Sequence, residues 1–466
     1  MRKSFYLKTF GCQMNEYDSD RMRDIINNLG YEDEKPYYDD VDLVILNTCH
    51  IREKAAEKLY SDLGRISAYK KKREDKGKDM IIAVCGCTAE ADGEEIFKRN
   101  KDVDIVLGPQ AYHNLTKAIE KIEDVRKNPK EKDGKRIRFK ELVKTNKFIS
   151  LECNTEEKFE SFGIHKKFNP VSAFVTIQEG CNKFCTFCIV PLTRGKEYCR
   201  ELHDVMHEVK VLASKGVREI TFLGQNVDAY LDKNGNRLST LIRETSKINE
   251  IARIRYVTSH PINITDDLIL AHKECEKLMP ILSLPVQSGS TAILKKMNRK
   301  YTREFYIDKV QKLREARPDL IMSSDFIVGF PNETDQDFED TMTLVKEIKF
   351  NAQSFSFVYS PRSGTTASVM KDSVDAQTKK ERLYRLQDLL EEQRTNFNNS
   401  FLGQTIEVLF DNKENRGGLQ ISGRTPFLQV CIVEAKNPQE KDELYGQIRN
   451  VKITKITTNS MQGELI

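Results

Sequence analysis

The chain has 466 residues, which is enough for about three domains at roughly 150 residues per domain. Hydrophobic residues make up 39% and charged residues 31%, and no apolar run approaches the roughly 18 residues that a membrane span needs, which argues against an integral membrane protein. The net charge of +4, from 75 Lys and Arg against 71 Asp and Glu, is too small to mark the whole chain as a nucleic-acid binder.

The N-terminus and the cysteine count both indicate a cytoplasmic protein. The opening segment MRKSFYLKTFGC becomes polar too early for a secretory signal. Eleven cysteines is an odd number in a large chain without such a signal, which argues against a disulfide framework. We therefore expect a soluble protein of a reducing compartment, whose thiolates serve as ligands or nucleophiles.

Residues 1–125 alternate short apolar runs with amphipathic helical stretches. Met22, Ile25, Ile26 and Leu29 recur at helical spacing before Gly30, which is a plausible end for a helix. Strands separated by helices indicate a parallel α/β sheet. The expected strands are 5–9, 41–46, 80–84 and 105–107, and further helices are expected at 53–65 and near 94.

Residues 126–166 are predicted to form a basic linker. The part from 126 to 147 carries ten Lys and Arg against three acidic residues and includes Pro129 and Gly134. A solvated connector is the main interpretation of this segment, and an RNA-facing patch is the alternative.

A second series of strand and helix patterns occupies residues 167–399. Six such units in a row suggest a barrel or partial barrel, which places its chemistry in the loops at the carboxyl ends of the strands. A long helix, 376–396, follows them. The expected strands are 173–177, 219–223, 254–257, 281–284, 321–327 and 354–357.

The last segment, 400–466, is predicted to be a small all-β barrel. Its expected strands, 405–410, 419–422, 429–433 and 446–456, are short, alternating and separated by Gly and Pro. Small β-barrels often bind nucleic acid, but the fold alone supports that role only by analogy.

The strongest motif is CxxxCxxC, formed by Cys181, Cys185 and Cys188 directly after the strand at 173–177. Three thiolates on one short loop can hold three irons of a 4Fe-4S cube and leave the fourth iron without a protein ligand. The alternatives are a zinc knuckle or a ferredoxin cluster with four cysteines. A zinc site usually has a second cysteine pair, and none follows nearby.

A second group of cysteines lies in the first domain. Cys12, Cys49 and Cys87 each directly follow a predicted strand, and open α/β sheets place ligands at that edge. Three buried structural cysteines are the alternative. Gly11 and Gly86 favour a ligand site, because glycine lets the backbone turn tightly around a bulky group.

The remaining cysteines are predicted to have no function beyond packing. Cys85 competes with Cys87 for the third position, but it lies within an apolar run. Cys153, Cys199, Cys275 and Cys431 stand alone in the sequence.

The CxxxCxxC motif after the first strand of a βα series resembles the radical S-adenosylmethionine (SAM) superfamily. That resemblance implies a (β/α)6 partial TIM barrel, in which SAM chelates the open iron of a 4Fe-4S cluster and an electron from the cluster cleaves SAM to a radical. With both cysteine groups, the chain resembles the methylthiotransferase branch, whose core lies between an N-terminal cluster domain and a C-terminal TRAM domain. The matching segments are KTFGCQMNEYDS, NTCHIREKA, LGPQ, GCNKFCTFCIVPLTRGKE, GQNVDAY, LPVQSGS, MNRKYT, SSDFIVGFPNET and FSFVYSPRSGT.

Within that branch, NTC followed by HIREKA, together with GQNVDAY, most resembles enzymes that methylthiolate carbon 2 of N(6)-isopentenyladenosine next to the tRNA anticodon. That carbon is neither acidic nor electrophilic, so a radical is the expected tool. The alternatives are methylthiolation of threonylcarbamoyl-adenosine in tRNA or of a ribosomal protein aspartate. A non-enzymatic iron-sulfur RNA-binding protein is a further alternative, and it requires four protein ligands per cluster.

The resemblance also implies the roles of the two groups and the partners. One SAM would methylate a sulfur held at an auxiliary 4Fe-4S cluster on Cys12, Cys49 and Cys87. A second SAM, bound to the 4Fe-4S cluster at the CxxxCxxC motif, would supply the radical. The expected partners are a tRNA anticodon stem-loop, a typical target because its bases are single-stranded, and an electron-donor protein. We expect a monomer with no membrane partner.

Further binding residues follow from the same resemblance and from their places at strand ends. Gln225, Gln287 and Asp325 rank highest, and each candidate could instead be a cap or turn residue. Arg424 is an RNA-binding candidate in a C-terminal module that has eight basic and eight acidic residues from 403 to 466. The chain departs from the family pattern at Ser283, usually His, and at Cys199, usually Ser. The predicted SAM-binding residues are Phe187, Gly224, Gln225, Asn226, Ser259, Gln287, Ser288, Asp325 and Gly329.

Overall fold

The computed structural model describes residues 3–50, 53–127, 131–132, 135–136, 147–151, 155–160, 171–413 and 418–466. Most of the predicted linker at 126–166, with Cys153, lies outside these ranges. The chain forms two compact units. No helix among the described residues has the length and apolar character needed to cross a bilayer. Unit 1 is Met1–Lys167, Glu179–Cys181 and Ile189–Tyr198, and unit 2 is Phe168–Gln178, Asn182–Cys188 and Cys199–Ile466.

Unit 1 contains a six-stranded parallel sheet in the order β2-β1-β3-β4-β5-β8. This confirms the predicted parallel α/β sheet and adds two short strands. The polar sequence of β2 gave no strand pattern, and the three-residue β8 lies within the segment predicted as a linker. The strands are β1 (Lys3–Thr9), β2 (Tyr31–Glu34), β3 (Leu43–Thr48), β4 (Ile81–Gly86), β5 (Ile105–Leu107) and β8 (Phe148–Ser150), with the short pair β6 (Glu131–Lys132) and β7 (Lys135–Arg136) outside the sheet.

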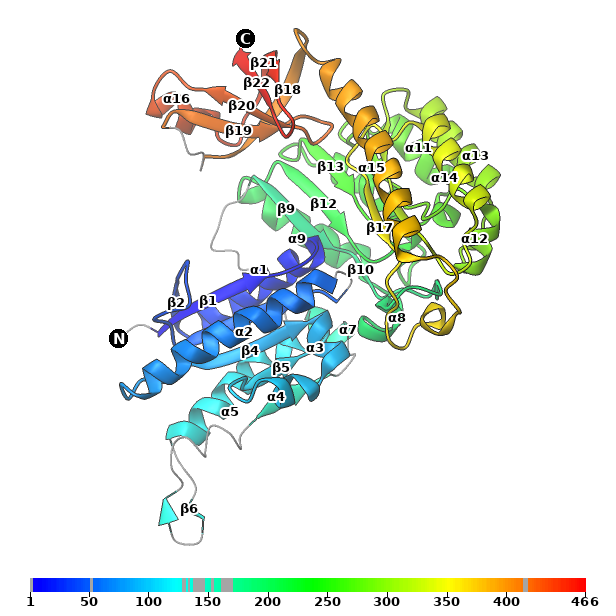
Figure 1. Cartoon of the computed structure of the whole chain (residues 1–466). Helices are drawn as coiled ribbons and strands as arrows, with labels where there is room; N and C mark the ends of the chain where they lie inside the picture. Colours follow the sequence, from blue (N-terminus) through cyan, green and yellow to red (C-terminus); the bar gives the residue numbers. More distant parts are fainter. Residues whose placement is uncertain are drawn as a thin grey trace. The chain divides into compact units, whose positions relative to one another are not determined.

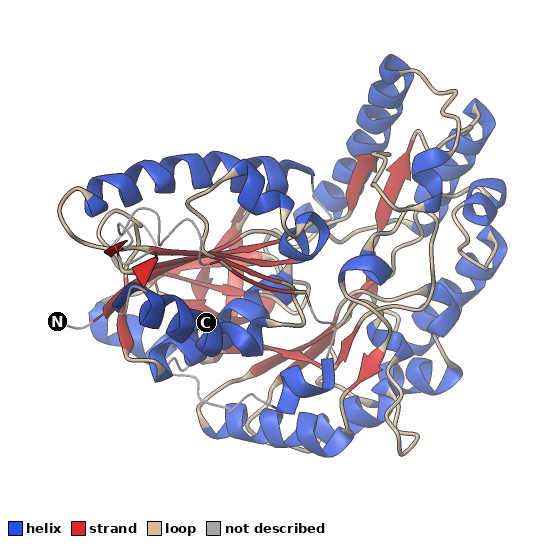
Figure 2. Ribbon diagram, turned by 90° about the horizontal axis from the view of Figure 1, so that it is seen from below, coloured by secondary structure: helices blue, strands red, loops and turns tan. Residues whose placement is uncertain are grey.

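Helices cover both faces of this sheet (Figure 2). Along β3, Leu43 and Ile45 pack on one face against α1 and α5, and Val44 and Leu46 pack on the other against α2. The alternation follows from the two-residue period of a strand and explains why the central strands are apolar throughout. The helices are α1 (Gln13–Asn28), α2 (Glu53–Glu74), α3 (Cys87–Asp92), α4 (Glu95–Arg99), α5 (Leu115–Lys127), α7 (Thr155–Glu160), α8 (Val190–Thr193) and the 3-10 turn η1 (Tyr112–Asn114).

Unit 2 contains the strands of the predicted partial barrel, and every described pairing among them is parallel. The strands form the sets β13-β12-β9, β14-β15 and β16-β17. They are β9 (Ser172–Thr176), β12 (Glu219–Leu223), β13 (Arg253–Tyr256), β14 (Ile281–Ser283), β15 (Ile321–Ser323), β16 (Asp325–Val328) and β17 (Phe355–Val358), and the two-residue strands β10 (Gln178–Glu179) and β11 (Tyr198–Cys199) lie at the unit boundaries.

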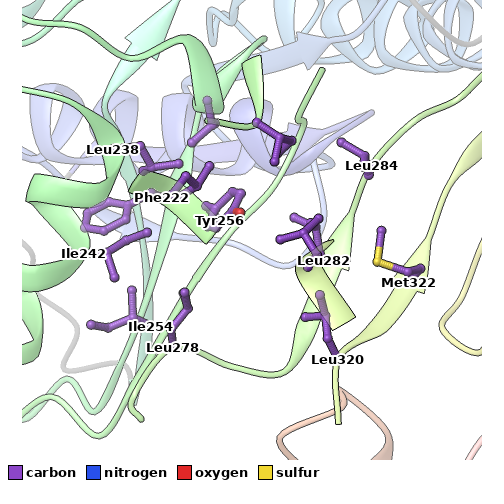
Figure 3. Close-up of a cluster of buried hydrophobic side chains, with 14 of the residues drawn as sticks. Phe222, Leu238, Ile242, Ile254, Tyr256, Leu278, Leu282, Leu284, Leu320 and Met322 are labelled. Atoms are coloured by element: carbon purple, nitrogen blue, oxygen red, sulfur yellow. The ribbon is translucent and has the colours of Figure 1, made fainter. Parts of the chain in front are cut away.

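The helices of unit 2 cover these strands, as Figure 1 shows for α11, α13, α14 and α15. Figure 3 shows part of the core, where Phe222 of β12 and Ile254 of β13 lie with Leu238 and Ile242 of α10. Burying each such side chain contributes about 1.5–3 kcal/mol. The helices are α9 (Leu202–Ser214), α10 (Leu238–Ser246), α11 (Asp266–Glu274), α12 (Thr291–Lys296), α13 (Arg303–Ala316), α14 (Asp335–Ile348) and α15 (Ala376–Asn399), with 3-10 turns η2 (Val227–Ala229), η3 (Pro261–Asn263) and η4 (Thr366–Val369).

The single strand predicted at 321–327 is two strands, and this prediction was wrong. The break falls at Ser324, whose hydroxyl accepts a hydrogen bond from the Val286 N–H at 2.9 Å. Before the break, β15 pairs with β14, and after it β16 pairs with β17. The apolar run alone could not show this change of partner.

The C-terminal segment of unit 2 is a closed five-stranded barrel in the order β18-β19-β20-β22-β21, which confirms the predicted small all-β module. Its last strand was not predicted, because MQGEL has one strongly apolar residue at each end and a glycine between them. The elements are β18 (Thr405–Asn412), β19 (Gln420–Arg424), β20 (Val430–Glu434), α16 (Pro438–Leu444), β21 (Ile448–Ile456) and β22 (Met461–Leu465).

Candidate functional site

Cys12, Cys49 and Cys87 lie at the carboxyl ends of β1, β3 and β4, which are consecutive neighbours in the sheet of unit 1. Cys12 precedes α1, Cys49 directly follows β3, and Cys87 is the first residue of α3. Because parallel neighbours end at the same edge, residues far apart in the sequence meet there.

Two glycines allow the close approach of these strand ends. Gly11 has φ +127°, and a Cβ built on it would lie 2.2 Å from Cβ of Cys49. Gly86 has φ +92°, and a Cβ on it would lie 2.4 Å from the carbonyl oxygen of Thr48. Any larger residue at either position would force the cysteines apart, so the sequence requires glycine there.

The three thiols interact with one another and with one cation. A hydrogen bond with Cys49 is the main cause that lowers the pKa of the Cys12 thiol to about 6, and the charge of Arg194 acts in the same direction. Nε of Arg194 donates a hydrogen bond to Sγ of Cys87 at 3.4 Å. Burial nevertheless raises the pKa of Cys87. The thiolate form is thus favoured more at Cys12 than at Cys87.

Arg194 belongs to a fully buried ion network within unit 1. Its Nη2 lies 2.9 Å from Oδ2 of Asp18, and its Nη1 lies 3.5 Å from Oε2 of Glu179. Lys158 contacts the same two carboxylates, and the Tyr112 hydroxyl donates to Asp18. Burial alone would raise the pKa of Asp18, but the two cations outweigh it and the pKa lies below its ordinary value. The network therefore holds two cations and two anions beside the cysteines.

Arg194 was not among the predicted site residues. It follows the CxxxCxxC motif within PLTRGKE, one of the segments that carries the resemblance, and that membership was the only available signal. Gln110 of the LGPQ segment fixes its backbone, since Nε2 of Gln110 donates to the Arg194 carbonyl at 3.1 Å.

Three cysteines at one sheet edge are a donor set that fits an iron-sulfur cube, because each thiolate can bind one of its irons. The ten described cysteines form no disulfides, which leaves all three thiols available as ligands.

The CxxxCxxC motif begins in unit 1 with Cys181 and continues in unit 2 with Cys185 and Cys188. All three are partly exposed. In unit 2 the loop is held by Asn298, whose Nδ2 donates to the Phe184 carbonyl at 2.9 Å. The Cys188 N–H donates to the Cys185 carbonyl at 3.0 Å, which closes a tight turn.

A second buried arginine, also not predicted, contacts this motif. Nη1 of Arg299 donates to Sγ of Cys185 at 3.5 Å. Its other donors bind the Tyr301 hydroxyl at 2.8 Å and the Pro285 carbonyl at 2.7 Å. Within the described part of the chain, no carboxylate lies at ion-pair distance from Arg299, although the side chain is only 5% exposed.

The predicted Gly224–Asn226 segment follows β12, and Gln178 orients it. Oε1 of Gln178 accepts the N–H of Gln225 at 2.9 Å and the N–H of Asn226 at 3.0 Å. A Cβ on Gly224 would lie 2.6 Å from the same oxygen, so this position also needs glycine. Gln178 was missed because nothing in its local sequence distinguishes it from an ordinary strand-end residue.

Two predicted residues carry buried polar atoms with no partner among the described residues. These are both side-chain polar atoms of Asn226 and the hydroxyl of Ser259. The residues are 2% and 5% exposed. Since a buried polar group without a hydrogen bond is costly, these atoms fit a polar ligand bound at the strand ends.

The structure brings Gln287 and Asp325 together but ties Ser288 and Gly329 into turns. The N–H of Gln287 donates to the Asp325 carbonyl at 3.0 Å, and Gln287 has φ +73°. The Ser288 hydroxyl accepts the Ser290 N–H at 3.2 Å, and the Gly329 N–H donates to Glu333 at 2.7 Å. The predicted SAM contacts of all four residues stay predictions.

One face of the β16-β17 pair is open and partly aromatic. In register, Asp325 lies opposite Phe355 and Ile327 opposite Phe357, so all four side chains share a face. The opposite face, including Phe326, is buried in the main core. Phe355 and Phe357 are 45% and 43% exposed, which is unusual for two neighbouring phenylalanines.

This open face continues toward the CxxxCxxC loop. Ile327 and the predicted residue Phe187 both pack against one small hydrophobic cluster that includes Phe330 and Tyr359. Sequence reasoning missed Phe355 and Phe357, because a half-exposed aromatic strand residue has the same pattern as a core residue.

The other cysteines lie in packing environments. Cys85, Cys275 and Cys431 are buried in hydrophobic clusters, and burial raises the pKa of Cys85 and of Cys431 to about 12. Sγ of Cys199 accepts the Leu231 N–H at 3.5 Å.

Arg424, the predicted RNA contact, is exposed and paired. Its Nε lies 3.4 Å from Asp411 on the neighbouring strand β18 of the C-terminal barrel. A phosphate contact from this side chain would have to share the guanidinium with that carboxylate.

Comparisons with known proteins cover both units. The Radical SAM superfamily matches residues 175–345, and the Uncharacterized protein family UPF0004 matches residues 4–108. The tRNA-2-methylthio-N(6)-dimethylallyladenosine synthase of Rickettsia canadensis (strain McKiel) is 47% identical over 470 residues, covering all of both chains. The enzyme of the same name from Rickettsia felis is 46% identical over 471 residues, also covering all of both chains.

A solved structure supports the fold. The radical S-adenosylmethionine methyltransferase TsrM from Kitasatospora setae has a TM-score of 0.54 at 12% identity, over 79% of this chain and 75% of that one. At this identity the similarity concerns the fold alone.

The contact between Cys12 and Cys49 can be tested without any metal. Mild oxidation of the metal-free chain should join these two cysteines, and Gly11→Ala should remove most of the product, because its Cβ would displace Cys49. Peptide mass spectrometry measures the crosslink. Gly30→Ala is the control, since it has a comparable positive φ but nothing within 4 Å of the added Cβ. Equal crosslinking in both variants would contradict the described geometry.

Proposed function

Because the chain belongs to the family of tRNA-2-methylthio-N(6)-dimethylallyladenosine synthases, a branch of the radical SAM enzymes, we propose that it methylthiolates carbon 2 of N(6)-isopentenyladenosine next to the tRNA anticodon. The match over the full length supports this substrate. The observation that carries the proposal is the meeting of Cys12, Cys49 and Cys87 at one sheet edge, in addition to the CxxxCxxC motif.

SAM and one 4Fe-4S cluster follow from membership in the radical SAM superfamily. Cys181, Cys185 and Cys188 would hold that cluster, and a second cluster would lie on Cys12, Cys49 and Cys87. When bound, these groups supply the radical chemistry and the sulfur that the reaction at an unreactive C–H carbon requires.

The other site residues would bind and orient SAM. Gln178 holds the backbone of Gly224–Asn226 in place through two N–H groups. Asn226 and Ser259 offer buried polar atoms to the ligand, and Gln287 and Asp325 lie at neighbouring strand ends. Phe187 packs beside this region.

The target base would stack on Phe355 and Phe357. A single-stranded loop can turn a base outward, and aromatic side chains are the usual surface for it. The dimethylallyl group is apolar, and so is Ile327 on the same open face of β16-β17. The tRNA backbone would contact basic groups elsewhere, with Arg424 and the segment 126–147 as candidates.

We further propose a cellular setting for the reaction. The enzyme would act as a monomer in the cytoplasm, where tRNA is modified, and would receive electrons from a donor protein. The chain has eleven cysteines, and this odd number does not fit a disulfide framework. It is compatible with a reducing compartment.

Nucleoside analysis tests the proposed reaction. Cells that lack the protein should lose the methylthio form of N(6)-isopentenyladenosine and retain N(6)-isopentenyladenosine itself. Mass spectrometry of digested tRNA measures both nucleosides. The intact gene should restore the product, whereas chains with Cys12→Ala or Cys185→Ala should not. Loss of a threonylcarbamoyl-linked methylthio nucleoside instead would overturn the substrate assignment.

Iron analysis tests the two clusters. The reconstituted chain should bind about eight irons, and replacing either cysteine triad by alanine should leave about four, because each triad holds one cube. Cys275→Ala is the control and should not change the iron content, since Cys275 is buried in the main core. If the intact chain bound only about four irons, the proposed auxiliary cluster would be contradicted.

The SAM pocket can be tested by equilibrium binding to the anaerobically reconstituted protein. Asn226→Ala and Ser259→Ala should each weaken SAM binding about 2- to 12-fold, since each removes a hydrogen bond of about 0.5–1.5 kcal/mol. Ser288→Ala should change the affinity much less, because its hydroxyl already bonds within the turn. Unchanged affinity in all three variants would place SAM elsewhere.

Binding of an anticodon stem-loop tests the aromatic face. Phe355→Ala and Phe357→Ala should each weaken binding of the isopentenylated RNA about 5- to 150-fold, which corresponds to about 1–3 kcal/mol of base stacking. Tyr384→Ala, which removes a 53% exposed ring from α15, should have little effect. Equal losses at Tyr384 and Phe355 would contradict a specific platform.

A further inference from the structure

Each cysteine group has one buried arginine that donates a hydrogen bond to one of its sulfurs. In unit 1, Arg194 contacts Sγ of Cys87 at 3.4 Å, and in unit 2, Arg299 contacts Sγ of Cys185 at 3.5 Å. The two arginines are 2% and 5% exposed. We propose that Arg194 and Arg299 are positioning residues, one for each thiolate group, which stabilise the anionic cluster and raise its reduction potential. This inference rests on the proposed function, since it concerns the clusters that the thiolates would hold.

The charge of a reduced cluster favours a cation beside it. A cube held by three thiolates gains a further negative charge on reduction, so a nearby cation and an N–H donor favour the reduced form. A buried guanidinium is suited to this task, because it stays protonated and has five donors in a fixed plane. Water screens its field little at these depths.

The two arginines are fixed in different ways. The carboxylates of Asp18 and Glu179 hold Arg194, and Lys158 balances the second of these charges. Removal of Arg194 would therefore leave a net negative charge directly beside Cys12 and Cys87. Cluster assembly and cluster reduction would both become less favourable.

Neutral partners hold Arg299. Its Nε and Nη2 donate to the Tyr301 hydroxyl and the Pro285 carbonyl, which fix the plane of the guanidinium. No described carboxylate lies within ion-pair distance of Arg299, and the buried carboxyl of Asp228 interacts with it only from farther away. Sγ of Cys185 is therefore the nearest described group that could carry a counter-charge, once it binds a cluster. Such a buried cation is costly unless an anion faces it, and a cluster on Cys185 supplies that anion.

Two cysteine backgrounds allow each cluster to be measured alone in the full-length chain. One carries Cys181→Ala, Cys185→Ala and Cys188→Ala, and the other carries Cys12→Ala, Cys49→Ala and Cys87→Ala. Arg194→Gln and Arg299→Gln are placed in each background. Anaerobic redox titration followed by electron paramagnetic resonance gives the midpoint potential, and iron analysis gives the occupancy.

The expected result is a reciprocal pattern. Arg194→Gln should lower the potential and the iron content only where Cys12, Cys49 and Cys87 remain. Arg299→Gln should do so only where Cys181, Cys185 and Cys188 remain. Arg194→Lys and Arg299→Lys keep the charge and should restore part of each loss. Arg382→Gln is the matched control: it removes another buried arginine, paired with Glu333 at 2.8 Å, and should leave both potentials unchanged.

A purely structural role gives a different result. Lower melting temperatures with unchanged potentials at full iron occupancy would overturn the proposal, as would equal shifts from both glutamine variants in one background. Where a glutamine variant does not fold, the lysine variant decides, because it loses the directed N–H bond and should still lower the potential. If the background that keeps Cys12, Cys49 and Cys87 binds no iron with Arg194 intact, the auxiliary cluster itself is excluded, which separates that failure from failure of this inference.

Discussion

The parallel pairing of β1, β3 and β4 is the constraint on which the proposed chemistry depends. It brings together three cysteines separated by 37 and 38 positions, from Cys12 to Cys49 and from Cys49 to Cys87. Gly11 and Gly86 permit the approach, since a Cβ at either one would overlap the neighbouring strand end. Asn15 and Asn47 then tie the edges together through a buried side-chain contact of 3.2 Å.

Thiolates gathered in a protein interior repel one another and lose hydration, so the fold must provide compensating charge. In unit 1, Arg194 provides it as part of a network in which Asp18 and Glu179 keep the cations in place. In unit 2, Arg299 provides it through a neutral scaffold. These two solutions differ in their tolerance of change. Loss of Arg194 leaves two buried anions with one cation, whereas the hydrogen-bond partners of Arg299 are uncharged.

The open face of β16-β17 suits a different ligand from the cysteine sites. Its exposed phenylalanines and Ile327 offer apolar contact, whereas Asn226 and Ser259 offer hydrogen bonds at other strand ends of the same unit. A cofactor with a charged amino acid portion needs polar partners, and a base that carries a dimethylallyl group needs an apolar surface. The partial barrel thus presents two chemically different surfaces, an apolar one on a face of β16-β17 and a polar one after β12 and β13.

The sequence by itself indicated most strands and helices of the two units, the small C-terminal barrel and the CxxxCxxC group, because these depend on local periodicity and on spacing along the chain. The grouping of Cys12, Cys49 and Cys87 followed only from the expectation that their three strands are parallel neighbours. Cys181, Cys185 and Cys188 lie on one short loop, so their spacing alone indicated a shared ligand. Only the tertiary structure decided the break at Ser324, the contacts of Gln178, Arg194 and Arg299, and the exposure of Phe355 and Phe357. The physical reason is that hydrogen-bond partners, burial and the face to which a strand residue points depend on segments far away in the sequence, and these become neighbours only when the sheets have formed.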